Sequence, residues 1–169
     1  MEKPKNMNEE YKISPKAQIG HVHLTVKNIE KSLKFYKDIL GFEVQQHLGG
    51  AVFLSAGGYH HHIGLNIWGS EYARQPEEGQ IGLYHFAILY PSRKELAKAM
   101  KKIIEAGYQL TGSADHGVSE AVYLKDPDGN GLELYYDKPK KDWPLDKNGK
   151  IKMFTHHLDV NALIAEADL

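Results

Sequence analysis

The sequence has no cysteine among its 169 residues, so it can form neither a disulfide bond nor a thiolate metal site. It also lacks an excess of charge: 21 basic and 22 acidic side chains give a formal net charge of -1, which offers no electrostatic attraction to nucleic acid. No apolar run is long enough to cross a bilayer, and the N-terminus, MEKPKNMNEE, is too polar for a signal peptide. We therefore expect a cytoplasmic protein that binds neither nucleic acid nor a membrane.

Two similar segments organise the chain. The first, IGHVHLTV, contains His21, and the second, GLYHFAIL, contains His85. When His21 is laid on His85, each half continues from a strand into a helical pattern, which ends at Gly41-Phe42 or at Gly107-Tyr108. Three shorter strand-like segments follow each glycine. The repeat predicts an α+β fold in which two βαβββ modules form a shared cup-shaped mixed β-sheet with the helices outside.

The repeat also predicts the domain organisation. Pro76, several charges and two glycines indicate a linker between the halves. Asp159 precedes an apolar pattern and is expected to cap a short terminal helix. We predict a flexible arm at 1–15, a single domain at 18–137 made of module 1 (18–68), a linker (69–80) and module 2 (81–137), and a C-terminal tail at 138–169.

Strand alternation indicates which side chains share a face. In HVHLTV the apolar residues Val22, Leu24 and Val26 lie on one face, so His21 and His23 lie on the other. The same alternation places His85, Glu133 and His62 on that second face of their own strands. Two imidazoles and one carboxylate are the ligands of a divalent metal with open coordination positions. We therefore predict that His21, His85 and Glu133 bind a metal at the floor of a cup.

Simpler interpretations apply to the other candidates. A lone histidine in a strand is usually hydrogen-bonded or exposed, and His23 has only Ala87 as its repeat partner, so we expect a pocket residue there. His60 and His61 are expected in a solvated loop. The turn at 126–131 is expected to connect two strands of a hairpin and to position Glu133, because its acidic residues lack the ligand spacing of a calcium loop.

Several motifs carry a family resemblance. The segments GHVHLTVKNIEKSLKFYKDILGF, YHFAIL and DPDGNGLEL resemble the vicinal oxygen chelate superfamily, which includes glyoxalase I, fosfomycin and bleomycin resistance proteins, and extradiol ring-cleaving dioxygenases. The resemblance covers about residues 18–137. Within the superfamily, LSAGGYHHHIGLNIW and HGVSEAVYLKDPDGNGLELY are similar to bacterial catechol 2,3-dioxygenase-type chains. This resemblance implies Fe(II), or occasionally Mn(II), held by His21, His85 and Glu133, with a catechol-type aromatic and dioxygen as substrates.

The resemblance also implies roles for three further residues. His62 would act as a general base and then as an acid, while His116 and Tyr123 would hydrogen-bond the metal-bound substrate oxygen. Extradiol enzymes of this type usually carry four modules, whereas this chain has two. Small two-module members of the superfamily often form homodimers, in which ligands can come from two chains.

Two other functions stay open. A glyoxalase I-type isomerase or lyase, with Ni(II) or Zn(II), would use four ligands, two from each module. Aligning GLN with GLE puts Asn66 at the module 1 position that mirrors Glu133, and an amide is a poor ligand there, although His62 could act as a fourth ligand. The third function is a small-molecule-binding (resistance) protein that holds an antibiotic or aromatic in the cup without turnover.

Overall fold

The structure is a computed structural model that describes residues 11–75, 77 and 79–168. Residues 1–10 of the expected arm, together with Pro76 and Glu78 of the expected linker, lie outside this part. Module 1 contains β1 (Val22–Thr25), α1 (Ile29–Leu33), the π-helix η1 (Lys34–Ile39), β2 (Glu43–Leu48), β3 (Ala51–Ser55) and β4 (Ile63–Asn66). Module 2 contains β5 (Phe86–Tyr90), α2 (Arg93–Glu105), β6 (Leu110–Asp115), β7 (Ser119–Lys125) and β8 (Gly131–Asp137). The 3-10 helix η2 (Ser70–Tyr72) lies between them, and η3 (Lys140–Asp142), α3 (Val160–Ala165) and η4 (Glu166–Asp168) follow β8.

Each module forms a four-stranded mixed sheet with the same topology. The strand orders are β1-β4-β3-β2 and β5-β8-β7-β6. In each sheet the first strand pairs in parallel with the last, and the remaining pairs are antiparallel. The predicted α+β fold of two βαβββ modules is therefore confirmed, and β1 and β5 are edge strands of their sheets.

The helices of the two modules are capped at their starts and end at the glycines predicted from the sequence. Asn28 Oδ1 accepts a hydrogen bond from Lys31 N before α1, and Ser92 Oγ accepts one from Glu95 N before α2. Gly41 and Gly107 follow the helical segments with φ of 83° and 81°, a conformation that glycine adopts without steric cost. One difference is that the first helical segment continues from α1 into η1, a π-helix.

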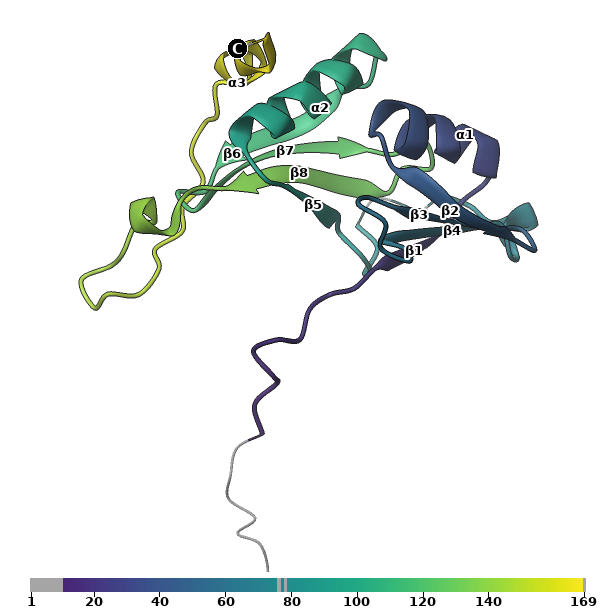
Figure 1. Ribbon diagram of the computed structural model, residues 1–169, viewed down its shortest axis with the longest axis horizontal. Coiled ribbons are helices and arrows are strands. Elements are labelled where there is room, and N and C mark those ends of the chain that lie inside the picture. Colours follow the sequence, from purple (N-terminus) through teal and green to yellow (C-terminus); the bar gives the residue numbers. More distant parts are fainter. Residues whose placement is uncertain (1–10, 76, 78, 169) are drawn as a thin grey trace, which may run out of the picture.

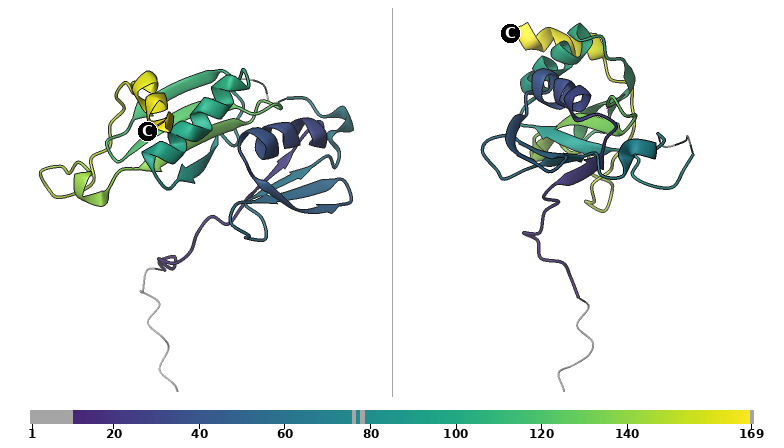
Figure 2. Two further views of the ribbon diagram at one scale, coloured as in Figure 1. Left: turned by 45° about the horizontal axis from the view of Figure 1, so that its top comes forward. Right: turned by 90° about the vertical axis from the view of Figure 1, so that its right-hand side faces the viewer.

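α1 and α2 cover the same side of their two sheets, as Figures 1 and 2 show. Apolar side chains from this side of the strands pack against α2 and η1 in one core, which includes Leu24, Leu65, Leu134 and Met100. Burial of this apolar surface is the main contribution to the stability of the fold. The alternate residues of β1, β5 and β8 lie on the opposite side, which is the side that the strand alternation assigned to the metal ligands.

The turn between β7 and β8 joins the two modules. It is the hairpin connection predicted from the sequence, and it also contacts module 1. Tyr36 Oη donates a hydrogen bond of 2.7 Å to Asp126 Oδ2, and Lys27 N donates one of 3.1 Å to Asp128 Oδ1. Burial and the neighbouring Asp126 carboxylate raise the pKa of Tyr36 well above its ordinary value, so the phenol remains a donor. This turn therefore holds β8 at a fixed position relative to module 1.

The C-terminal segment packs back onto module 2. Asp159 Oδ1 accepts a hydrogen bond from Ala162 N and caps α3, as predicted. Arg93 at the start of α2 pairs with Glu120 on β7 and with Glu166 on η4. Both carboxylates raise the pKa of Arg93 even though burial lowers it, so the guanidinium bridges the two elements as a cation. No helix in the described ranges is long and apolar enough to cross a membrane.

Candidate metal centre

His85 and Glu133 form the closest pair among the predicted ligands. His85 lies one residue before β5, and Glu133 lies on β8 opposite Ala87, between the buried Leu132 and Leu134. The two side chains converge, with His85 Nε2 2.9 Å from Glu133 Oε2 and relative exposures of 29% and 15%. An imidazole nitrogen and a carboxylate oxygen thus meet at a partly buried place on the face away from the helices.

Tyr123 and His116 extend this pair. Tyr123 on β7 is the direct cross-strand partner of Glu133, and its ring centre lies 5.6 Å from that of His85. Burial, and then the charge of Glu133, raise the pKa of Tyr123 to about 12, so its hydroxyl keeps its proton at neutral pH. Tyr123 Oη is 2.8 Å from His116 Nε2. Four of the predicted site residues are therefore neighbours in module 2.

His21 occupies a different position. It lies one residue before β1, as His85 lies before β5, but its side chain is exposed and its ring centre is 4.3 Å from that of His61. Across residues 11–75, 77 and 79–168, no three His, Cys, Asp or Glu side chains come close enough together to hold a metal ion. The three-ligand set thus remains a prediction, with two members paired and the third on module 1.

The histidine run 60–62 differs in part from expectation. His60 is exposed, as expected for a solvated loop. His61 is half-buried, because its ring packs between His21 and Phe53, whose ring centre is 5.0 Å away. Burial, followed by the neighbouring His21, lowers the pKa of His61 and favours the neutral ring. Strand alternation did not identify this contact, because His61 lies in the turn before β4.

The His62 side chain contacts the end of β3. Ala56 N donates a hydrogen bond of 3.3 Å to His62 Nδ1, and Ser55 Oγ lies 3.3 Å from the same nitrogen. A backbone N–H can only donate, so Nδ1 carries no proton and the neutral ring carries its proton on Nε2. His62 is also next to the start of β1, because Val22 N donates to its carbonyl oxygen.

Strand register corrects the proposed counterpart of Glu133 in module 1. Glu133 pairs with Ala87, which lies two residues after His85; the corresponding residue after His21 is His23, and it pairs with Gly64. Gly64, and not Asn66, therefore mirrors Glu133. The GLN and GLE motifs look alike but are offset by two residues in register. The Asn66 side chain instead accepts a hydrogen bond of 3.0 Å from Trp68 N at the end of β4.

The ring of His23 fills the space above Gly64. A Cβ at Gly64 would lie 2.9 Å from two ring atoms of His23. The His23 ring also lies 5.9 Å from the ring of Phe53 and 5.8 Å from that of Trp68, centre to centre. Next to these aromatics is a groove of about 410 Å³ lined by Gln45, Gln46, Leu48, Phe53, His60 and His61. His23 is not among the residues that line this groove, so its place as a pocket residue stays a prediction.

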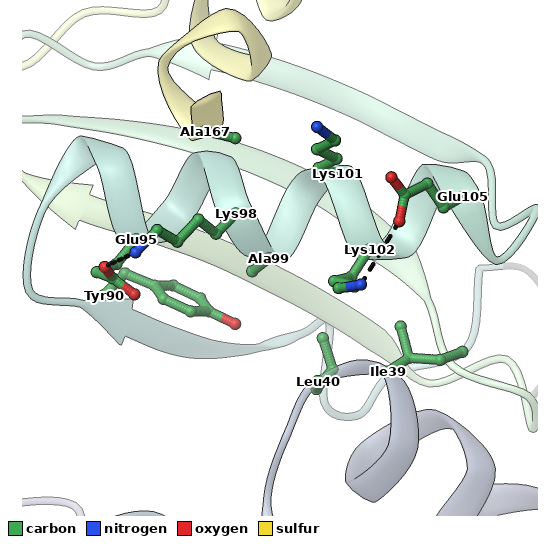
Figure 3. A pocket seen from close by; sticks show the side chains of 10 residues that line it. All are labelled: Ile39, Leu40, Tyr90, Glu95, Lys98, Ala99, Lys101, Lys102, Glu105 and Ala167. Carbon is green, nitrogen blue, oxygen red and sulfur yellow. Dashed lines mark hydrogen bonds and ion pairs between the residues drawn. The ribbon is translucent and has the colours of Figure 1, made fainter. Parts of the chain in front are cut away.

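A second groove lies on the helix side of the molecule (Figure 3). It has a volume of about 450 Å³ and runs between α2 and the end of η1, with Tyr90, Lys98 and Leu40 among its lining residues. None of the predicted site residues lines it. The chemistry predicted from the sequence thus belongs to the opposite face of the sheets.

Comparisons with known proteins bear on the family and the fold of this chain. The sequence model of the glyoxalase/bleomycin resistance protein/dioxygenase superfamily matches residues 18–134. A catechol-2,3-dioxygenase from Bacillus subtilis (strain 168) is 43% identical over 149 residues, which are 88% of this chain and 52% of the relative. A manganese-dependent 2,3-dihydroxybiphenyl 1,2-dioxygenase from Geobacillus genomosp. 3 is 27% identical over 139 residues, covering 80% of this chain and 42% of that protein. The chain thus spans about half the length of these relatives.

Solved structures show the same fold. The crystal structure of a glyoxalase/dioxygenase from Nostoc punctiforme superposes with a TM-score of 0.61 at 19% identity, and covers 78% of this chain and 99% of that one. At this identity the likeness concerns the fold alone.

Proposed function

Because this chain belongs to the glyoxalase/bleomycin resistance protein/dioxygenase superfamily, we propose that it is a metal-dependent extradiol dioxygenase that cleaves a catechol-type aromatic with dioxygen. The observation that carries this proposal is the convergence of His85 and Glu133 beside the hydrogen-bonded pair Tyr123 and His116. These four side chains supply metal ligands and proton-exchanging groups at one place, in a chain whose relatives include a catechol-2,3-dioxygenase.

The donor atoms of His85 and Glu133 fit a divalent metal. An imidazole nitrogen and a carboxylate oxygen at 2.9 Å from one another are both partly shielded from water, and such mixed donors suit Fe(II) or Mn(II). His21 is the third ligand in this proposal. Gly64 at the mirrored position has no side chain, which argues against the four-ligand set of a glyoxalase I-type isomerase.

His21 has two ways to complete the set: the start of β1 approaches the start of β5 in the same chain, or His21 comes from a second chain of a homodimer. A mixing experiment separates them. His21→Ala and Glu133→Ala chains are unfolded, refolded together and tested for stoichiometric metal binding. Regained binding assigns His21 to a second chain, and its absence assigns His21 to the same chain.

When bound, the metal supplies open coordination positions for both catecholate oxygens and dioxygen. The chain's own residues orient the substrate and move its protons. Tyr123 keeps its proton and can donate a hydrogen bond to a substrate oxygen, since its pKa is raised to about 12. His62 and His116 are the residues proposed to exchange protons with the substrate.

The direct test is anaerobic reconstitution of the purified chain with Fe(II), followed by air and catechol. We expect a yellow ring-opened product with stoichiometric oxygen uptake, and the same treatment of Glu133→Ala should give neither. A parallel reconstitution with Mn(II) tests the alternative metal. Stoichiometric metal binding without product from a panel of catechols would overturn the proposal, and hemithioacetal isomerisation with Ni(II) or Zn(II) would then be assayed.

A further inference from the structure

The C-terminal segment reaches His116, which is hydrogen-bonded to Tyr123. His116 Nδ1 lies 3.0 Å from the carbonyl oxygen of Phe154, while Nε2 lies 2.8 Å from Tyr123 Oη. A carbonyl oxygen can only accept a hydrogen bond, so Nδ1 must carry the proton of the neutral ring. His116 Nε2 therefore faces the site without a proton.

Several contacts hold Phe154 in this position. The backbones of Asp115 and His156 exchange two hydrogen bonds of 3.0 and 2.9 Å, and Phe154 N donates one of 3.3 Å to the His116 carbonyl oxygen. Lys138 contacts both Asp115 carboxylate oxygens at 2.8 Å at the start of the segment. The Lys138 ammonium and the Gly117 N–H lower the pKa of Asp115 despite its partial burial, which keeps this ion pair charged. The segment is thus anchored on both sides of Phe154.

Gly117 provides the space for this packing. A Cβ at Gly117 would lie 2.7 Å from the Phe154 ring and 2.9 Å from Pro144 Cγ, so any larger residue would displace the segment. His116, Gly117 and the segment therefore form one packed unit next to Tyr123.

His62 presents the opposite tautomer. Its Nδ1 accepts a hydrogen bond from Ala56 N, so the proton of the neutral ring is on Nε2. A group that takes a proton from a substrate hydroxyl needs an unprotonated nitrogen facing that hydroxyl. His116 meets this requirement with Nε2. His62 would first have to break the hydrogen bond between its Nδ1 and Ala56 N.

We propose that the C-terminal segment, through the Phe154 carbonyl, fixes the tautomer of His116 and so makes His116 the acceptor of the first substrate proton, with His62 as a hydrogen-bond donor to the substrate. The substrate O–H bond breaks, an N–H bond forms at His116 Nε2, and the resulting imidazolium continues to donate from Nδ1 to Phe154. When substrate binds, the Tyr123 Oη–H turns to the substrate oxygen. Phe154 is a positioning residue that acts through His116. The catalytic part of this proposal rests on the proposed function, but the tautomer does not.

The first measurement is a long-range proton–nitrogen NMR spectrum of the full metal-free chain labelled with ¹⁵N-histidine, at a pH where the histidines are neutral. His116→Gln and His62→Gln identify the two signals by their loss. We expect His116 as the Nδ1–H tautomer and His62 as the Nε2–H tautomer. Because no metal or turnover is involved, failure of the dioxygenase proposal would leave this result unchanged. An Nε2–H tautomer at His116 would overturn the inference.

The second measurement compares two glycine variants. Gly117→Ala pushes against Phe154, whereas Gly149→Ala has a similar left-handed φ, 80° against 75°, but meets no atom within 4 Å. Gly117→Ala should give a mixture of His116 tautomers and lower kcat about 10-fold with KM nearly unchanged, because proton transfer is affected and binding is not. Gly149→Ala should keep the single His116 tautomer and the kcat of the unchanged protein. An unchanged His116 tautomer and an unchanged kcat in Gly117→Ala would contradict the role of the segment, and if Gly117→Ala does not fold, the wild-type spectrum alone decides.

Discussion

The two modules share a backbone but differ in the chemistry of equivalent positions. Each has a histidine directly before its first strand and the same parallel pairing of first and last strands. Module 2 carries Glu133 where module 1 has Gly64. His85 therefore meets a carboxylate, whereas the ring of His21 lies against the ring of His61. One repeated backbone thus supplies a pair of imidazole and carboxylate in module 2, and a group of imidazole and aromatic rings in module 1.

The largest expected effect comes from removing the carboxylate that distinguishes module 2. Glu133→Ala should weaken metal binding at least about 100-fold and abolish turnover, because a neutral pair of imidazoles no longer balances the charge of the ion. His21→Ala should likewise weaken metal binding and abolish turnover, because it removes the ligand from module 1. The matched control is Glu43→Gln, which removes an exposed carboxylate on β2. Metal analysis after dialysis measures the effect, and stoichiometric metal in either ligand variant would show that the ligand set is wrong.

The second prediction asks whether module 1 contributes proton transfer without a further ligand. His62→Ala should retain metal and lower kcat by about 10²- to 10⁴-fold, the usual contribution of a positioned acid or base. His60→Ala, an exposed neighbour in the same turn, should change neither quantity. Loss of metal from His62→Ala would instead make it a fourth ligand and would favour the isomerase.

The third prediction concerns the turn by which module 2 contacts module 1. Asp126 accepts hydrogen bonds from Tyr36 Oη and from two backbone N–H groups of its own turn. Asp126→Ala should lower the free energy of unfolding by about 3 kcal/mol or more, because these buried donors lose a charged acceptor. Asp146→Ala is the control: Asp146 caps a similar turn through Asn148 N and Lys150 N, in an exposed setting. Equal losses in urea denaturation of the two variants would mean that the contact between modules adds nothing.

A fourth prediction tests the glycine that replaces the carboxylate in module 1. Gly64→Ala should cost about 1–2 kcal/mol of unfolding free energy, because the new methyl group meets the His23 ring at 2.9 Å. The loss should largely disappear in a His23→Ala background. Gly82→Ala, where nothing lies within 4 Å, provides the control. If Gly64→Ala is equally destabilising with and without His23, the ring is not what excludes a side chain.

The smallest predicted effect is on alkaline stability and involves the helix side of module 2. Burial raises the pKa of Tyr90 to about 12, above its ordinary value of 10.0. The stabilisation is complete below pH 10 and is lost as the pH rises from 10 to 12, because the unfolded phenol ionises first. Tyr90→Phe should make the fall of the denaturation midpoint over this range shallower. Tyr72→Phe, at a ring that is 88% exposed, should leave it unchanged. The same slope in both variants would contradict the burial effect.

Much of the fold was predictable because the signals are local. Strand alternation, the helix-ending glycines and the Asp159 cap each depend on a few neighbouring residues, and β2 is the first of the strands expected after Gly41. The π-helical continuation of α1 was not predicted, because the apolar spacing from Ser32 to Leu40 fits an α-helix equally well.

The candidate site was predictable only in part, since contacts between distant segments leave no local pattern. Repetition of a histidine before each first strand identified His21 and His85, and alternation placed Glu133 on the correct face. Motif similarity misplaced the counterpart of Glu133, because register depends on strand pairing and not on the resemblance of GLN to GLE. The Phe154 carbonyl could not be found from the sequence, because every residue has such an oxygen.

The proposed site requires one metal ion to be shared by the two unlike modules. Anomalous diffraction from crystals of the Fe(II)-loaded protein, grown without oxygen, tests this directly. We expect one anomalous peak per site, within bonding distance of a His21 imidazole, of His85 Nε2 and of a Glu133 carboxylate oxygen. A peak on His85 and Glu133 with His21 still packed against His61 would contradict it.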